Sequence, residues 1–291
     1  MGSSRVDLVV TDLDDTIYDW LGFYIPSFLA MVSELHRITG IGEEDLKRSF
    51  QRVHRAHRTT EYAFAIESLD VLRDIDADLT IDQKLAKYAP AIEAFRAVRH
   101  ETLKPYPYVQ ETLEALRGAG IPVVAHTDSM SGYVSRRLRQ LQLDEYFAAI
   151  CAPLDHGLPP DTPPHLRRRR RNADMLARTR VLVFPLGARK PSVETVRPIL
   201  DAFAISPHRV LYIGDSISRD IALARGAGFI DVWARYGHQH AREYYADLLR
   251  ITYWTKEDLE VDDRLRRETQ SISPSFVVDR YDELLDICGL R

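Results

Sequence analysis

Six short apolar runs recur along this chain of 291 residues, and stretches with helical spacing separate them. The runs are rich in β-branched residues and nearly continuous rather than alternating, which is typical of strands covered by helices on both faces. They are Val6–Thr11, Ile121–Thr127, Phe147–Ala152, Val210–Gly214, Ile230–Arg235 and Phe276–Asp279. Strands that alternate with helices build a parallel sheet from βαβ units. The sequence therefore predicts an α/β fold with a doubly wound parallel sheet.

One long helical stretch interrupts this alternation directly after the first predicted strand. It runs roughly from Phe23 to Leu103 and contains no strand candidate. Gly40 is expected to end a helix, and Thr80 with Gln83 resembles a capping box. We therefore predict an all-helical domain over residues 21–104, inserted into a core formed by residues 1–20 and 105–291.

Two further segments depart from the strand and helix pattern. Residues 153–189 carry clustered prolines and five consecutive arginines, Arg167–Arg171, and are expected to form an irregular insertion in the core. The arginine run is interpreted as a solvated loop or helix face, with binding of a nucleic acid or an acidic partner as the alternative. Residues 237–274 are charged and helical in pattern, and are expected to extend the core.

The composition excludes several classes of protein. The chain has 39 lysine and arginine residues against 43 aspartate and glutamate residues, a net charge of −4, so we expect no nucleic-acid or membrane partner for the chain as a whole. No apolar run reaches the roughly 18 residues of a membrane-spanning helix. The two cysteines, Cys151 and Cys288, form no disulfide framework. These features favour a cytoplasmic protein, and the sequence leaves open whether it is a monomer or a homodimer.

Acidic side chains directly follow two of the predicted strands. Asp12 and Asp14 come after the first strand, and Asp215 follows the run Val210–Gly214, with Asp220 five residues further on. In an open parallel sheet, ligands bind at the carboxyl ends of strands near the point where the strand order reverses. Carboxylates crowded at such an edge call for a cation, and hard oxygen ligands suit Mg²⁺.

Two other positions supply groups that bind phosphate oxygens. The run Ile121–Thr127 ends in a hydroxyl and is followed by Asp128, so a hydroxyl and backbone amides lie at this strand end. Lys190 places a compact cation before Pro191, and the pattern Ser192–Phe203 predicts a helix there.

The ordered set Asp12-Leu13-Asp14-Asp15-Thr16, Thr127, Lys190 and Gly214-Asp215-Ser216 with Asp220 resembles the four-motif signature of the haloacid dehalogenase superfamily of phosphohydrolases. This resemblance implies a Rossmann-like core, a helical cap inserted after the first strand, and Mg²⁺-dependent phosphoryl transfer through an aspartyl-phosphate. Dehalogenases of the superfamily lack the second aspartate of the first motif, so Asp14 favours a phosphatase. Asp15 departs from the glycine that many members carry at that position.

The resemblance also implies a role for each matching residue. Asp12 is expected to be the nucleophile and Asp14 the general acid and base. Thr127, Asp128 and Lys190 are expected to hold the phosphoryl group. The expected metal ligands are Asp12, the backbone carbonyl of Asp14, and Asp215, with Asp220 and Ser216 beside them.

Four residues near or within the predicted cap are candidates for contacting the substrate, namely Tyr18, His54, His57 and Arg58. The histidines and the arginine suggest a cationic lid over an anionic substrate. The alternative is a half-buried histidine beside a solvated arginine face, with Tyr18 packing at the hinge.

The sequence thus predicts a Mg²⁺-dependent phosphatase acting on a small phosphorylated metabolite. Two alternatives stay open. A phosphomutase or other phosphotransferase would use the same motifs, and a non-catalytic protein could bind a partner through the arginine run.

Overall fold

The fold is known from a computed structural model that describes residues 6–155, 157, 179–185, 187–237 and 242–291. Seven parallel strands form one sheet in the order β4-β3-β2-β1-β5-β6-β7. Their bounds are Leu8–Thr11 (β1), Val123–His126 (β2), Ala149–Ala152 (β3), Arg180–Val183 (β4), Val210–Gly214 (β5), Ile230–Ala234 (β6) and Phe276–Val278 (β7). The order reverses at β1, which pairs with β2 on one side and β5 on the other. The predicted doubly wound α/β core is confirmed.

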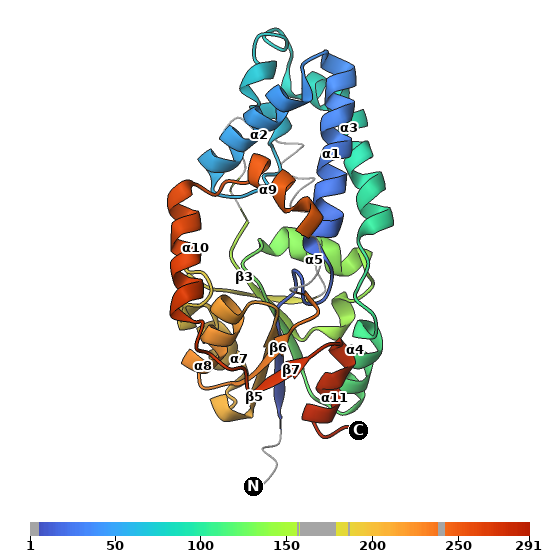
Figure 1. The fold of residues 1–291 in the computed structure, drawn as a ribbon. Coiled ribbons are helices and arrows are strands. Elements are labelled where there is room, and N and C mark those ends of the chain that lie inside the picture. The colour runs from blue at the N-terminus through green and yellow to red at the C-terminus, as the bar shows by residue number, and fades with distance from the viewer. Residues whose placement is uncertain (1–5, 156, 158–178, 186, 238–241) are drawn as a thin grey trace. The chain divides into compact units, whose positions relative to one another are not determined.

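Helices cover both faces of this sheet. Figure 1 shows α7 (Arg197–Phe203) and α8 (Ala222–Gly226) on one side of the strands, and α4 (Val109–Gly118) and α11 (Leu284–Ile287) on the other. A further helix, α5 (Ser131–Gln140), follows β2. The side chains between the sheet and α7 and α8 are fully buried and apolar; they include Leu8, Val10, Val124, Val210, Ile199 and Leu223. Burial on both faces explains why the strands appear as continuous apolar runs.

The insertion predicted to be irregular contains one strand that the sequence analysis missed. Strand β4 pairs with β3, with Ile150 beside Val181. The apolar stretch is only Val181–Phe184, and it follows a segment rich in proline and arginine that masks its signal. The arginine run Arg167–Arg171 lies outside the residues that the structure describes.

The helix predicted from Ser192 begins later than expected. A 3₁₀ turn occupies Val193–Thr195, and α7 begins at Arg197. A helix starting at Ser192 would place Pro198 in its interior, where the ring clashes with the carbonyl four residues earlier. With the start at Arg197, Pro198 lies in the first turn, where no N–H is needed.

A second compact unit comprises Trp20–Leu103 and Ala241–Arg264, and its described residues form helices and turns but no strand. Its first segment contains α1 (Trp20–Thr39), α2 (Glu43–His57) and α3 (Ile81–Thr102), with α1 packed along α3. Gly40 follows α1 at φ +71°, and the capping box of Thr80 and Gln83 is present. Among the described residues, no helix has the length and apolar character needed to span a membrane.

The predicted extension of the core, residues 237–274, is wrong in part, because residues 241–264 belong to the helical unit. Here α9 (Tyr245–Ile251) packs against α2 and α1, and α10 (Lys256–Glu268) follows. The ring of His54 bonds the Ile251 carbonyl at 2.6 Å, and Arg58 forms a bidentate ion pair with Asp258 at 2.8 and 2.9 Å. Leu248 and Ile251 of α9 are buried. The helices that α9 packs against, α1 and α2, lie about 200 positions earlier in the sequence, so the sequence pattern did not show this packing.

We expect His54 to make the stability of the helical unit dependent on pH. Burial lowers the pKa of His54 to about 4, whereas an unfolded histidine titrates near 6.5. The unfolded chain therefore takes up a proton first, and the contribution present above about pH 6.5 is lost as the pH falls toward 4. In urea unfolding, the free energy of unfolding of the wild type should fall between pH 7 and 4.5. In His54→Gln this fall should be smaller by about 2–3 kcal/mol.

The matched control is His100→Gln, a substitution of an exposed histidine on α3. It should leave the wild-type pH dependence unchanged. If the free energy of unfolding depended on pH in the same way in the wild type and in His54→Gln, His54 would not be the source of that dependence.

Candidate active site

The site begins with the turn that follows β1. The Asp12 amide donates to the Ile213 carbonyl of β5 at 2.9 Å, which fixes the backbone at the end of both strands. The Thr16 hydroxyl donates to the Asp12 carboxylate at 3.4 Å, and the Asp12 side chain is buried. Asp15 adopts φ +61°, a left-handed conformation that aspartate tolerates better than most residues. The glycine expected from the family is therefore not required for this turn.

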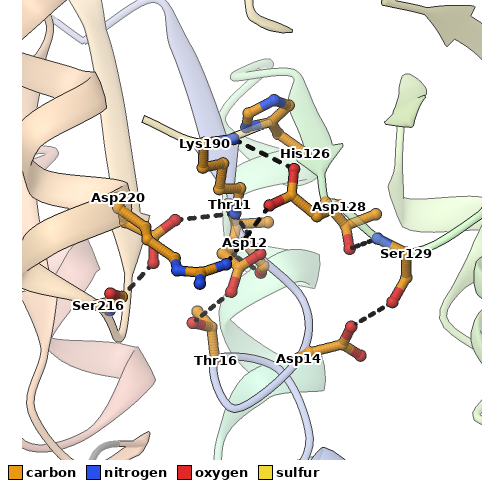
Figure 2. Close-up of polar contacts among 12 residues, drawn as sticks. Thr11, Asp12, Asp14, Thr16, His126, Asp128, Ser129, Lys190, Ser216 and Asp220 are labelled. Carbon is orange, nitrogen blue, oxygen red and sulfur yellow. Dashed lines mark hydrogen bonds and ion pairs between the residues drawn. The ribbon is translucent and has the colours of Figure 1, made fainter. Parts of the chain in front are cut away.

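A buried ammonium joins two of the carboxylates. Lys190 Nζ donates to Asp12 Oδ1 at 2.5 Å and to Asp220 Oδ1 at 2.8 Å (Figure 2). Asp220 also accepts bonds from the Ser216 amide at 3.0 Å and the Tyr212 hydroxyl at 3.2 Å. The predicted residues Asp12, Lys190 and Asp220 are thus brought together, and Ser216 contributes through its backbone.

Three carboxylates at this edge could hold a cation. Oxygen atoms of Asp12, Asp215 and Asp220 lie within 4.8 Å of one another. Burial raises the pKa of Asp12 well above its ordinary value, as do the neighbouring carboxylates, although Lys190 opposes the shift. Burial and the charges of Asp220 and Asp15 raise the pKa of Asp215 in the same way. A divalent cation would relieve this repulsion, and a set of carboxylate oxygens fits a hard ion such as Mg²⁺.

The second strand end supplies the predicted phosphate-binding groups. Thr127 follows β2, and its hydroxyl accepts a bond from the Ser129 amide at 3.0 Å. The Asp128 carboxylate accepts from the Lys190 amide at 3.3 Å and so links this loop to the segment that carries Lys190 (Figure 2). Since a carboxylate repels a phosphate, residue 128 can serve an anion only through its backbone amide.

The carboxylate of Asp14 lies apart from the Lys190 cluster. Ser129 Oγ donates to its Oδ2 at 2.6 Å, and Arg137 Nη1 donates to its Oδ1 at 3.0 Å (Figure 2 shows the bond with Ser129). The sequence analysis did not assign Ser129 or Arg137 to this site. One signal for Arg137 existed, because it lies at helical spacing with the buried residues Val134 and Leu138, where a charge is unexpected.

Two more residues beneath the site were also missed. The Tyr212 hydroxyl, which reaches Asp220, lies 2.8 Å from Nδ1 of His126. Burial lowers the pKa of His126 well below its ordinary value, so the ring is neutral at physiological pH. Tyr212 is the middle residue of β5 and His126 the last residue of β2, and each is a polar group in an apolar run where the pattern calls for an aliphatic one.

The four candidates for substrate contact have other partners. Tyr18 is fully buried, with the Arg137 guanidinium 5.9 Å from its ring centre. His54 is 1% exposed and bonds Ile251, and Arg58 pairs with Asp258. The His57 ring stacks on Tyr62 at 3.6 Å. These contacts resemble the alternative interpretation, a histidine packed beside an arginine face, although His54 is fully rather than half buried. A role of the four residues in substrate contact stays a prediction.

Comparison with known proteins gives a consistent set of relatives. The model of the haloacid dehalogenase-like hydrolase family matches residues 6–228. A glyceraldehyde 3-phosphate phosphatase from Methanopyrus kandleri is 25% identical over 292 residues, which cover 97% of each chain. A phosphoglycolate phosphatase from Vibrio vulnificus is 23% identical over 294 residues, 99% of this chain and 98% of the relative. The crystal structure of a phosphatase of the same superfamily from Thermococcus onnurineus has the same fold, with a TM-score of 0.54 at 17% identity over 98% of both chains.

The repulsion among the carboxylates leads to a prediction for Asp215→Asn. When folding raises the pKa of a carboxyl group, the free energy of unfolding falls as the pH rises through that pKa. Ionised Asp215 therefore opposes folding at neutral pH. In a chelator, the variant should be more stable by about 1 kcal/mol, a rise in Tm of roughly 2–4 °C. Added Mg²⁺ should then raise the Tm of the wild type more than that of the variant.

The control is Asp201→Asn, an exposed carboxylate on α7 that should change neither value. A lower Tm for Asp215→Asn together with an unchanged response to Mg²⁺ would show that Asp215 stands outside the cation site.

Proposed function

Because this chain belongs to the haloacid dehalogenase-like hydrolase family, we propose that it is a Mg²⁺-dependent phosphatase acting on a small phosphorylated metabolite. The observation that carries the proposal is the Lys190 ammonium held between Asp12 and Asp220, with Asp215 beside them. This cluster pairs a nucleophilic carboxylate with the positive charge that an anionic phosphate needs in order to approach it. The names of the two full-length relatives, phosphatases of glyceraldehyde 3-phosphate and of phosphoglycolate, support a small substrate.

In the first half of the proposed reaction, a carboxylate oxygen of Asp12 attacks phosphorus. A bond forms between this oxygen and phosphorus, and the bond between phosphorus and the leaving oxygen breaks, which gives an aspartyl-phosphate and an alcohol. Lys190 lies within hydrogen-bond distance of Asp12, so its ammonium can neutralise the charge of phosphoryl oxygens that bind beside this carboxylate. Thr127 and the backbone amide of residue 128 provide donors from the end of β2.

Asp14 carries the proton in both halves. Its carboxyl group protonates the leaving oxygen, and the resulting carboxylate then accepts a proton from the water that attacks phosphorus. That attack breaks the bond between Asp12 and phosphorus, releases inorganic phosphate and restores the Asp12 carboxylate. Asp14 is separate from the proposed nucleophile, because its carboxylate bonds Ser129 and Arg137, whereas Asp12 is bound by Lys190.

The residues that would hold Mg²⁺ are Asp12, Asp215 and the backbone carbonyl of Asp14. Asp220 is assigned to orient Lys190, because its carboxylate already accepts bonds from Lys190, Tyr212 and Ser216. Bound at this place, Mg²⁺ supplies positive charge that lowers the repulsion between the phosphate and the nucleophile.

Asp12→Asn tests the nucleophile. Because an amide cannot form the acyl phosphate, release of phosphate from p-nitrophenyl phosphate with Mg²⁺ should fall by more than about 10³-fold. The substitution conserves volume, so circular dichroism and Tm should show a folded protein. The exposed control Asp201→Asn should retain wild-type turnover.

One result would contradict the role of Asp12, and two others would contradict the phosphatase function. Retained turnover in a folded Asp12→Asn variant would exclude Asp12 as the nucleophile. A wild-type protein that releases phosphate from no member of a panel of small phosphorylated metabolites would contradict the phosphatase function, and a requirement for a bisphosphate activator would indicate a mutase.

Asp14→Asn tests the acid and base. Alkyl phosphates have poor leaving groups that must be protonated, whereas p-nitrophenolate leaves readily without a proton. We expect kcat to fall by about 10²–10⁴-fold for an alkyl phosphate such as glycerol phosphate and by a smaller factor for p-nitrophenyl phosphate. Equal losses for the two substrates would exclude Asp14 as the acid.

A further inference from the structure

Arg137 is a buried charge whose position calls for an explanation. Its side chain is only 4% exposed, and it lies on α5 between the buried residues Val134 and Leu138. Burying a guanidinium is strongly unfavourable unless a well-placed carboxylate compensates for the lost water. The carboxylate that the structure places against it is Asp14, at 3.0 Å.

The contact with Asp14 is one part of a two-sided arrangement. Arg137 binds Oδ1 of Asp14, and the Ser129 hydroxyl binds Oδ2 at 2.6 Å. The two donors come from different elements, Ser129 from the loop after β2 and Arg137 from α5. The ring of the fully buried Tyr18 lies against the guanidinium, and the Tyr18 carbonyl accepts the Asp15 amide at 2.8 Å. The turn that carries Asp14 is therefore held on both sides of its carboxylate.

The two bonds differ in kind. The bond from Arg137 is charge-assisted and comes from the buried face of α5, whereas the bond from Ser129 comes from a neutral hydroxyl that can rotate. Ser129 can release Oδ2 without separating any charges, while breaking the ion pair would leave a buried guanidinium without its partner. The oxygen bound by Ser129 is thus the one that can change partner during a reaction.

We propose that Arg137 is the positioning residue for Asp14: it keeps Oδ1 throughout the cycle, while Oδ2 exchanges the Ser129 hydroxyl for the leaving oxygen and then for the attacking water. Oδ2 therefore gives up the proton in the first half of the reaction and takes one from water in the second. This inference rests on the proposed phosphatase function and goes beyond it, because it specifies the reacting oxygen and the residue that orients it.

The test compares variants at Arg137, Ser129, Arg136 and Asp14 with the wild type, using p-nitrophenyl phosphate and glycerol phosphate with Mg²⁺. Arg137→Ala should lower kcat for glycerol phosphate by about 30–100-fold, with a smaller loss for p-nitrophenyl phosphate and little change in KM. Arg137→Lys retains the positive charge but lacks the planar guanidinium, and it should recover part of the loss in kcat. Ser129→Ala should cost less than about 5-fold, because its hydroxyl is replaced during turnover. Arg136→Ala, at the exposed neighbouring position on α5, should behave as wild type.

The same series includes Asp14→Asn alone and combined with Arg137→Ala. If Arg137 acts through Asp14, the double variant should be no slower than Asp14→Asn. Additive losses, equal losses on both substrates, or a Tm loss in Arg137→Ala that Arg137→Lys restores without restoring kcat would overturn the inference and leave Arg137 a structural residue.

If Arg137→Ala does not fold, Arg137→Lys decides the question by the same split between substrates. Failure of the proposed function looks different, because the wild type itself would then release no phosphate, and the inference would fall with it.

Discussion

The arrangement of the site depends on one buried ammonium, that of Lys190. It bonds Asp12 at the end of β1 and Asp220 after β5, the two neighbouring strands at which the sheet order reverses. Three charges taken out of water are tolerated only when each is paired and the remaining bonds are satisfied. The Asp12 amide, bound to the Ile213 carbonyl, and the Ser216 amide, bound to the Asp220 carboxylate, supply part of that support.

The close approach of Asp220 also explains a glycine in the motif. A Cβ added to Gly214 would lie 2.3 Å from Cγ of Asp220, closer than any side chain allows. Any larger residue at position 214 would displace the carboxylate that orients Lys190. Beneath it, Tyr212 and the neutral His126 place two polar side chains in an otherwise apolar layer and hold Asp220 from the sheet side. The sheet core and the site are therefore stabilised by some of the same residues.

Much of this could be predicted from the sequence, because it follows from general rules of parallel sheets. Continuous apolar runs located six of the strands, and the rule that ligands bind at strand ends singled out Asp12, Asp14 and Asp215. The resemblance to the family's motifs added Lys190 and Asp220, because no strand was predicted before Lys190. Strand β4 was missed because its run is short and follows an atypical segment. Arg137 was missed because its partner, Asp14, lies 123 positions away. The packing of α9 on α2 was missed for the same reason, since periodicity shows that a helix has an apolar face and not which distant face covers it.

The two carboxylates of the first motif stand two residues apart, and yet their surroundings differ. The turn after β1, with Asp15 in the left-handed conformation, directs Asp12 to Lys190 and Asp14 to Ser129 and Arg137. Each carboxylate thus has its own cation, one a compact ammonium shared with Asp220 and the other a guanidinium from α5. A shared cation would couple the two groups and place both on the phosphorus side of the site. In the proposed reaction, separate cations leave Asp12 beside Lys190 and keep Asp14 available for the leaving oxygen, so the backbone of this turn already separates the proposed nucleophile from the proposed acid.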